Sequence, residues 1–199
     1  MSASGIPGYP FDLELSIPTG EGQLAHLRPI RPDDKDRLVT FHRHLSYGSI
    51  YRRFLGPHPE LKPAEAERFT CVDYMERLAL VVEIADELVA VGRYDRLPGT
   101  NVAEVAFVVT DAFQHHGFGT VLLQQLAHAA RRQGITTFVA QTLVDNHDML
   151  HVFINSGFAS KTAASGNVVD VRLAIGPPPP TDSGLHLGTG GTPSSPLPS

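Results

Sequence analysis

The sequence predicts a mixed α/β fold of the α+β type, built around a central and mostly antiparallel sheet. Three observations support this prediction. Three apolar runs follow one another between residues 77 and 110, each of strand length and separated from the next by turn residues. Amphipathic helix patterns lie before and after these runs. A turn with two glycines, "QHHGFGT" at residues 114–120, joins the third run to the longest helix pattern.

Composition sets the limits of the domain. A chain of 199 residues with 42% apolar content can bury one good core. Residues 1–23 are rich in Gly and Pro, and we expect them to form an extended N-terminal arm. The periodic segments lie in residues 24–175, which form the predicted domain. Residues 176–199 contain no Lys or Arg and few large apolar groups, which predicts a disordered tail.

Charge and cysteine content exclude several classes of protein. The net charge is -5 and the pI about 6.0, so neither nucleic acid nor a membrane surface is an expected partner. No apolar run approaches the roughly 18 residues that span a bilayer, and the N-terminus lacks the pattern of a signal peptide. A single cysteine, Cys71, cannot form an internal disulfide. These features predict a cytoplasmic protein, and they do not decide between a monomer and a dimer.

The first part of the domain is predicted to hold one strand and three helical segments. The first helix pattern begins at Pro32 with two acidic residues, which suit a helix N-terminus. It also places Leu38, Phe41 and Leu45 on one face. The prolines of "GPHPELKP" keep the next two helical segments apart. In order, the strand and the three segments are expected at 22–32, 32–46, 48–55 and 63–70.

The second part alternates strands and helices after a run of three strands. The sequence "ADE" interrupts the apolar run 77–95, so this run is expected to form a hairpin. Gly134 provides a C-terminal stop for the longest helix. The remaining elements are expected to be a strand, a helix, a strand, a helix and a closing hairpin, at 101–110, 117–133, 135–143, 147–156 and 158–175.

The glycine turn predicts an anion site. A strand ends near Thr110, and successive backbone N–H groups then lead into the positive end of a helix dipole. Because Gly117 and Gly119 have no Cβ, phosphate oxygens can reach the main chain, and Thr120 can add its hydroxyl. The residues fit neither a P-loop, which needs Gly-Lys-Ser/Thr, nor a dinucleotide fingerprint, which needs a small residue where Leu122 stands. A tight strand-to-helix turn without a ligand is the alternative.

This turn resembles the pyrophosphate loop of the GNAT acyltransferases, Gln/Arg-x-x-Gly-x-Gly/Ala. The order of elements over 24–175 is similar to the GNAT fold, in which the central sheet splays at the cofactor site. The segment "DNHDMLHVFINSGF" is similar to the family's downstream segment, where an Asn opens a short helix beside the cofactor. Within the family, "LRPIRPDD", "YRRFLGP" and "ERFTCVDYMERLALV" most resemble the bacterial protein-lysine acetyltransferases.

The resemblance implies that acetyl-CoA is the co-substrate, that no metal is needed, and that the acceptor is a primary amine, most simply a protein lysine. It places the pantetheine arm against the backbone of Phe107, Val108 and Val109, and Asn146 and Phe153 beside it. Where other members carry a Tyr that protonates the leaving thiolate, this sequence has Phe153. The pyrophosphate is implied to bind at Gln114, His115, His116, Gly117, Phe118, Gly119 and Thr120.

Glu104 is the candidate catalytic base. An amine with a pKa near 10.4 must lose a proton before it attacks a thioester. Ala103 and Val105 share one face of the strand, which places Glu104 on the other. A carboxylate within so apolar a strand is expected to be buried and to have a raised pKa. The alternative is a Glu that faces water or pairs with Arg93.

The sequence is also compatible with other interpretations. The enzyme could act on a small amine or an antibiotic, or the domain could be a catalytically silent acyl-CoA sensor. His147 and His151 have the spacing of paired zinc ligands, but no third ligand is evident. Cys71 is a weak candidate for a thiolate nucleophile. Arg52 and Arg53 are neighbours on a predicted helix, so we expect that both do not point inward, and neither is assigned to the site.

Overall fold

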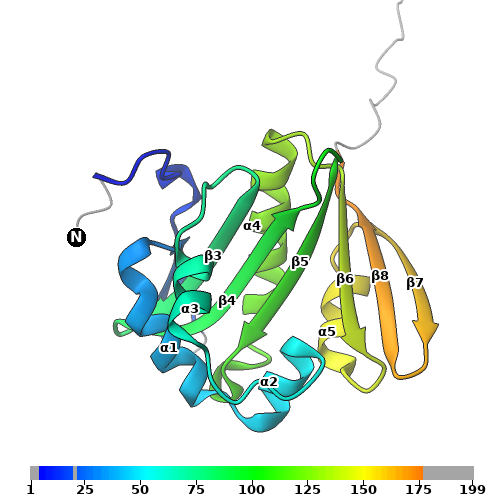
Figure 1. Cartoon of the computed structure of the whole chain (residues 1–199), viewed down its shortest axis with the longest axis horizontal. Coiled ribbons are helices and arrows are strands. Elements are labelled where there is room, and N and C mark those ends of the chain that lie inside the picture. The colour runs from blue at the N-terminus through cyan, green and yellow to red at the C-terminus, as the bar shows by residue number, and fades with distance from the viewer. Residues whose placement is uncertain (1–4, 20–21, 177–199) are drawn as a thin grey trace, which may run out of the picture.

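A computed structural model describes residues 5–19 and 22–176 (Figure 1). Its strands form one eight-stranded sheet in the order β1-β2-β3-β4-β5-β6-β8-β7. Only β5 and β6 are paired in parallel. The strands are β1 (Leu15–Pro18), β2 (Leu24–Pro29), β3 (Arg77–Ile84), β4 (Glu87–Arg96), β5 (Val102–Val109), β6 (Thr137–Leu143), β7 (Ala159–Ser165) and β8 (Val168–Ala174).

Helices cover both faces of this sheet. In the view of Figure 1, α1, α2 and α3 lie in front of the sheet and α4 lies behind it. The α-helices are α1 (Lys35–His44), α2 (Tyr47–Phe54), α3 (Pro63–Thr70), α4 (Phe118–Arg132) and α5 (His147–Ile154). The predicted mixed α/β fold is therefore confirmed, and its α-helices and its strands other than β1 fall within about three residues of their expected ends.

The period-2 pattern of the strands divides the core into two layers. On β3, Leu80 and Val82 pack on the α4 side, whereas Ala79 and Val81 pack under α1, α2 and α3. The α4 side is the larger layer and includes Leu122 of that helix. Because both faces are covered, the central strands are apolar on both sides.

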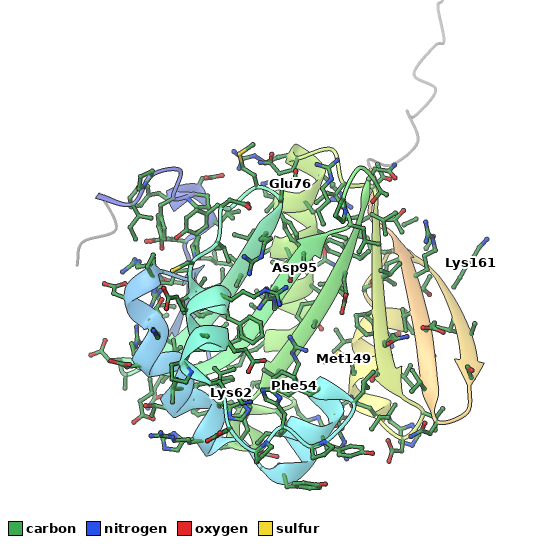
Figure 2. All side chains as sticks on the ribbon, in the orientation of Figure 1. Phe54, Lys62, Glu76, Asp95, Met149 and Lys161 are labelled. Carbon is green, nitrogen blue, oxygen red and sulfur yellow. The ribbon has the colours of Figure 1, made fainter. Side chains whose placement is uncertain are left out.

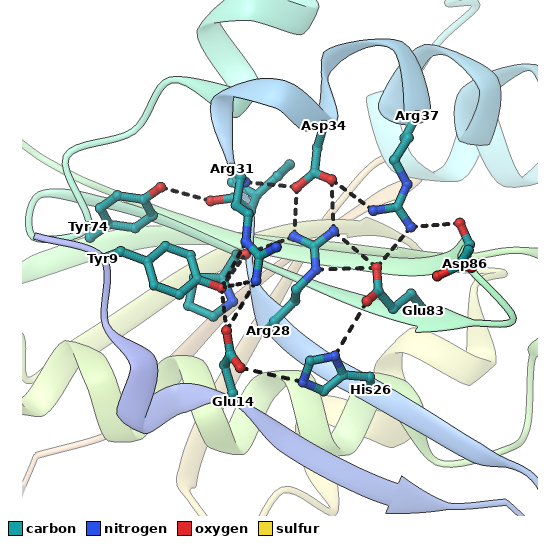
Figure 3. A network of polar contacts seen from close by, with 12 residues as sticks. Tyr9, Glu14, His26, Arg28, Arg31, Asp34, Arg37, Tyr74, Glu83 and Asp86 are labelled. Carbon is teal, nitrogen blue, oxygen red and sulfur yellow. Dashed lines mark hydrogen bonds and ion pairs between the residues drawn. The ribbon is translucent and has the colours of Figure 1, made fainter. Parts of the chain in front are cut away.

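The N-terminal segment differs from the arm that the sequence predicts. Residues 15–18 form β1, an edge strand paired antiparallel with β2, and the side chains of Tyr9 and Leu13 are buried. Figure 3 shows the polar network beside them, in which buried Arg28 donates to Asp34 at 2.7 Å and to Glu83 at 3.0 Å. The predicted tail lies outside the described residues, apart from Gly176.

The sheet opens between β5 and β6. Residues Val102–Glu104 pair in parallel with Thr137–Val139, and the pairing ends there. β4 remains paired with β5 as far as Val109, and β6 is paired with β8 along its whole length. The stretch 105–109 therefore has a strand partner on one side only. This is the splay that the family resemblance implied.

Candidate active site

A cavity of about 470 Å³ lies where β5 and β6 part. Its walls come from β5, from the turn before α4, from α5 and from α2, and Figure 2 shows Met149 of α5 beside the opening between the two strands. The cavity-lining residues that the sequence predicted are Phe107, Val108, Val109, Gln114, His115, Gly117, Phe118, Gly119, Thr120, Asn146 and Phe153.

The turn before α4 is shaped to receive an anion. His115 and Gly117 have left-handed backbone conformations, with φ of 64° and 82°. A non-glycine residue in this region is strained, and such strain is concentrated at functional sites. Gly117 at the N-cap of α4 has no side chain, and no side chain of the described residues caps this helix end. Its first backbone N–H groups thus remain available, with the positive end of the helix dipole behind them.

Gly119 keeps the space in front of this turn open. A Cβ at this position would come within 3.4 Å of Cγ2 of Val152 on α5. This is an ordinary van der Waals contact, so a Cβ fits there and would fill the space between the first turn of α4 and α5. The bare backbone fits a pyrophosphate group bound by main-chain N–H groups.

Hydrogen bonds fix the turn against α2. Asp111 accepts from the backbone N–H of Ser46 at 3.0 Å and from its hydroxyl at 2.7 Å. The hydroxyl of Ser49 donates to Asp111 at 2.9 Å and accepts from the amide of Gln114 at 3.1 Å. Burial alone would raise the pKa of Asp111, but the bonds from Ser46 and Ser49 lower it overall. The carboxylate is thus held in its charged form.

α5 closes the cavity on the side of β6. The side chain of Asn146 caps this helix by accepting from the backbone N–H of Met149 at 3.3 Å. Phe153 is 1% exposed, and its ring centroid lies 6.1 Å from that of Phe107 on β5. The two rings form an apolar floor between the parted strands. Phe153 offers no proton to a leaving group.

Glu104 lies at the fork of the two strands. It is the last residue of β5 that pairs with β6, and its partner on β4 is Asp95. Its side chain is exposed, so the predicted burial is wrong and the water-facing alternative is the one observed. In Figure 1, α2 lies at the C-terminal end of β5, away from this part of the strand. The alternative pair with Arg93 is also absent, since Arg93 donates to Asp95. Glu104 adjoins the cavity lining, which begins at Val105.

Comparison with known proteins identifies the family. The acetyltransferase (GNAT) family matches residues 47–158 of the chain, which include the glycine turn, the fork and α5. The chain belongs to the GNAT acetyltransferase family. It is thus a GNAT-type acyltransferase, as the motifs predicted.

Three relatives of this GNAT chain are informative. The crystal structure of the GNAT domain of S. lividans PAT superposes with a TM-score of 0.78 at 36% identity, covering 83% of this chain and 99% of that one. The acetyltransferase Pat of Mycolicibacterium smegmatis is 31% identical over 74% of this chain, which spans 45% of that relative. An acetyltransferase of Pseudomonas aeruginosa is 27% identical over 71% of this chain and 78% of its own length.

One predicted cofactor residue of the GNAT loop lies outside the cavity lining. His116 is exposed, and its Nδ1 lies 2.8 Å from the carbonyl oxygen of Gln114. Its ring stacks near Phe118. The side chain of His116 therefore stabilises the turn from outside.

Several cavity residues of this GNAT domain were not predicted. Arg52 and Arg53 both line the cavity, so the expectation that only one could face inward was wrong. Their long side chains reach the opening from adjacent positions on α2. The sequence "YRRF" contains both arginines, but it does not indicate which face of α2 meets the sheet. The other unpredicted residues are Ser49, Val105, Ala106, Phe113, Gln141, Thr142, Asp148, Met149, His151 and Val152.

The weaker candidates gain no support in the GNAT fold. Cys71 is exposed after α3 and is absent from the cavity lining. His147 and His151 are exposed, and residues 5–19 and 22–176 contain no cluster of three or more His, Cys, Asp or Glu that could hold a metal. Within the same ranges, every helix is too short or too polar to cross a bilayer.

Proposed function

We propose that this protein transfers an acetyl group from acetyl-CoA to the amine of a protein lysine. The observation that carries the proposal is the uncapped N-terminus of α4, strained at His115 and opened by Gly117, beside a sheet that parts at Glu104. This arrangement offers main-chain donors for a pyrophosphate and unpaired strand backbone for the amides of a pantetheine arm. Membership of the acetyltransferase family supports the same donor.

Glu104 is the proposed base of the transfer. Glu104 is at the fork and next to the cavity lining, where the acceptor amine would meet the acetyl group. Glu104 takes a proton from the amine, the nitrogen forms a bond to the carbonyl carbon, and the carbon–sulfur bond breaks. Phe153 has no ionisable proton to donate. The thiolate therefore leaves unaided or takes a proton from water, which the ordinary thiol pKa of about 8.5 permits.

The likeness to PAT proteins supports a protein lysine as the acceptor. The GNAT domain of S. lividans PAT matches along 99% of its length and 83% of this chain. A small-amine acetyltransferase remains the second candidate function, since α2 and the closing hairpin set the shape of the acceptor site. A silent acyl-CoA sensor is the third, and the exposed Glu104 beside the cavity argues against it.

An acetylation assay tests the proposal. Purified protein is incubated with acetyl-CoA and a panel of proteins, lysine peptides and small amines, and the products are analysed by mass spectrometry. The expected result is acetylation of lysine side chains that requires the protein. Acetylation of small amines alone would favour the second candidate. Binding of acetyl-CoA without acetylation of any acceptor would favour the sensor.

A further inference from the structure

Arg53 is a half-buried cation without a carboxylate partner. It extends from α2 and lines both the active-site cavity and a smaller apolar cavity of about 40 Å³ behind it. Its guanidinium lies 5.0 Å from the ring centroid of Phe54. Among the described residues, no carboxylate lies at ion-pair distance from it. A guanidinium removed from water without an anion is costly, so a missing partner of this kind points to a ligand.

The neighbouring arginines show the contrast. Arg93 donates to Asp95 at 2.8 Å and lies over the ring of Phe69 at 4.2 Å. Arg77 donates to the same Asp95 at 2.9 Å. Asp95 is therefore shared by two arginines, whereas no carboxylate of the described residues lies at ion-pair distance from Arg53. Burial and the charge of Arg93 lower the pKa of Arg53 to about 10, against the opposing effect of Glu104, so Arg53 is still charged at neutral pH.

Arg53 lies one helical turn along α2 from the residue that contacts the turn before α4. Ser49, four residues earlier on the same face of α2, holds the turn through Asp111. Arg53 follows one helical turn further along, about 6 Å along the axis. Arg53 and Arg93 of β4 line the same smaller cavity, and the charges that act on Arg53 are those of Arg93, Glu104, Asp95 and Glu65. The guanidinium thus lies between α2 and the part of β4 that carries Arg93.

We propose that Arg53 binds a carboxylate that the acceptor carries close to its reacting amine, with Arg52 as a second cation at the rim. The proposal rests on the proposed function. A protonated amine alone would be repelled by two unmatched guanidinium groups, whereas an attached carboxylate pairs with them. An acidic side chain next to the target lysine and the carboxylate of an amino acid supply the same chemistry. The preferred acceptor is therefore an amine with an acidic neighbour.

Matched acceptors test this specificity. Lysine peptides that differ only in Glu or Gln beside the lysine are compared by kcat/KM, together with an amino acid and its amide. The wild-type protein is expected to prefer the Glu peptide by about tenfold. Arg53→Met should remove this preference, and Arg53→Lys should retain part of it. Arg43→Met, on an exposed part of α1 outside the cavity, should retain it in full.

The outcomes separate this proposal from the proposed function. Equal rates for the Glu and Gln peptides would overturn the role of Arg53 and leave the acetyltransferase intact. If Arg53→Met instead weakens CoA binding, or abolishes a preference for succinyl-CoA over acetyl-CoA, the carboxylate or phosphate belongs to the donor and the acceptor role is overturned. If no acceptor is acetylated, calorimetric binding of the two peptides to the CoA-loaded protein still decides the question. Tighter binding of the Glu peptide would support the proposal, and equal binding would overturn it.

Discussion

The hydroxyl of Ser49 on α2 donates a 2.9 Å hydrogen bond to Oδ1 of Asp111, at the start of the turn that leads to α4. Asp111 also accepts from the backbone N–H and the hydroxyl of Ser46, the N-cap of α2. One carboxylate therefore holds α2 and the turn before α4 in a fixed relation. A change at Asp111 should be felt by both substrates.

We expect Asp111→Asn to weaken CoA binding and to raise the acceptor KM, each by about threefold to tenfold, because an amide accepts fewer of these hydrogen bonds. The lowered pKa of Asp111 also means that its stabilising effect is present above its ordinary pKa and is lost as the pH falls through the lower folded value. Calorimetry and steady-state kinetics measure the effects, with Asp36→Asn on exposed α1 as the control. A change in the CoA affinity alone, or in the acceptor KM alone, would contradict the coupling.

Gly119→Ala should separate ligand binding from stability. Alanine favours a helix over glycine by about 1 kcal/mol, so the melting temperature should hold or rise. The new Cβ occupies the space between the turn and Val152, so the CoA Kd should rise about tenfold, which is about 1.4 kcal/mol. Gly56→Ala, where a Cβ meets nothing within 4 Å, is the control. Gly117 is a poorer test, because its φ of 82° strains any side chain. Unchanged affinity in folded Gly119→Ala would count against the cofactor assignment.

Glu104→Gln should lower kcat by about 10²-fold if Glu104 is the base, because an amide cannot accept the proton. CoA affinity and melting temperature should hardly change, since this side chain is exposed and lies outside the cavity lining. Glu87→Gln, at the exposed start of β4, is the matched control. Full activity of Glu104→Gln would move the base to another group.

Glu83 should make stability depend on pH. Burial would raise the pKa of Glu83, but hydrogen bonds from Arg28 and Arg37 lower it to about 2. Because the folded pKa lies below the unfolded value, this stabilisation is present above about pH 4.5 and is lost as the pH falls toward 2. Glu83→Gln should lower the free energy of unfolding by on the order of 3 kcal/mol at pH 7. Urea unfolding at several pH values should show this difference narrowing with acid, and a constant difference would refute the assignment.

The domain boundary can be tested by truncation. A chain ending at Gly176 should keep its melting temperature and turnover, because the residues removed have too few apolar groups to dock. A chain ending at Ala174 should lose about 2–4 kcal/mol of stability, since Ile175 is fully buried and its N–H donates to Thr136. Equal losses for both truncations would show that the removed tail packs on the domain.

Most of the fold and part of the candidate site could be predicted from the sequence. Hydrophobic periodicity predicted every helix and all strands but β1, and the glycines of 114–120 predicted the turn. β1 was missed because it is a short and mostly exposed edge strand that depends on pairing with β2, which local pattern does not encode. Glu104 was expected to be buried because its strand is apolar, but exposure there depends on which helices reach β5. Arg53 was missed for a similar reason, since the docking of α2 on the sheet decides which of its side chains meet the cavity.

The pairing between β5 and β6 is the shortest among the described strands, with three residue pairs. Only Val102–Glu104 and Thr137–Val139 join β1–β5 to β6, β8 and β7 through backbone pairing. Separation of β5 from β6 breaks few backbone hydrogen bonds. The part formed by β6, β8 and β7 can therefore open locally at a lower free energy than the whole domain. A molecule bound to both sides raises the free energy of that opening in proportion to the logarithm of its concentration over its Kd. A substrate bound between β5 and β6 therefore connects the two parts of the sheet. We expect the unfolding of the domain to be most cooperative while the substrate is bound.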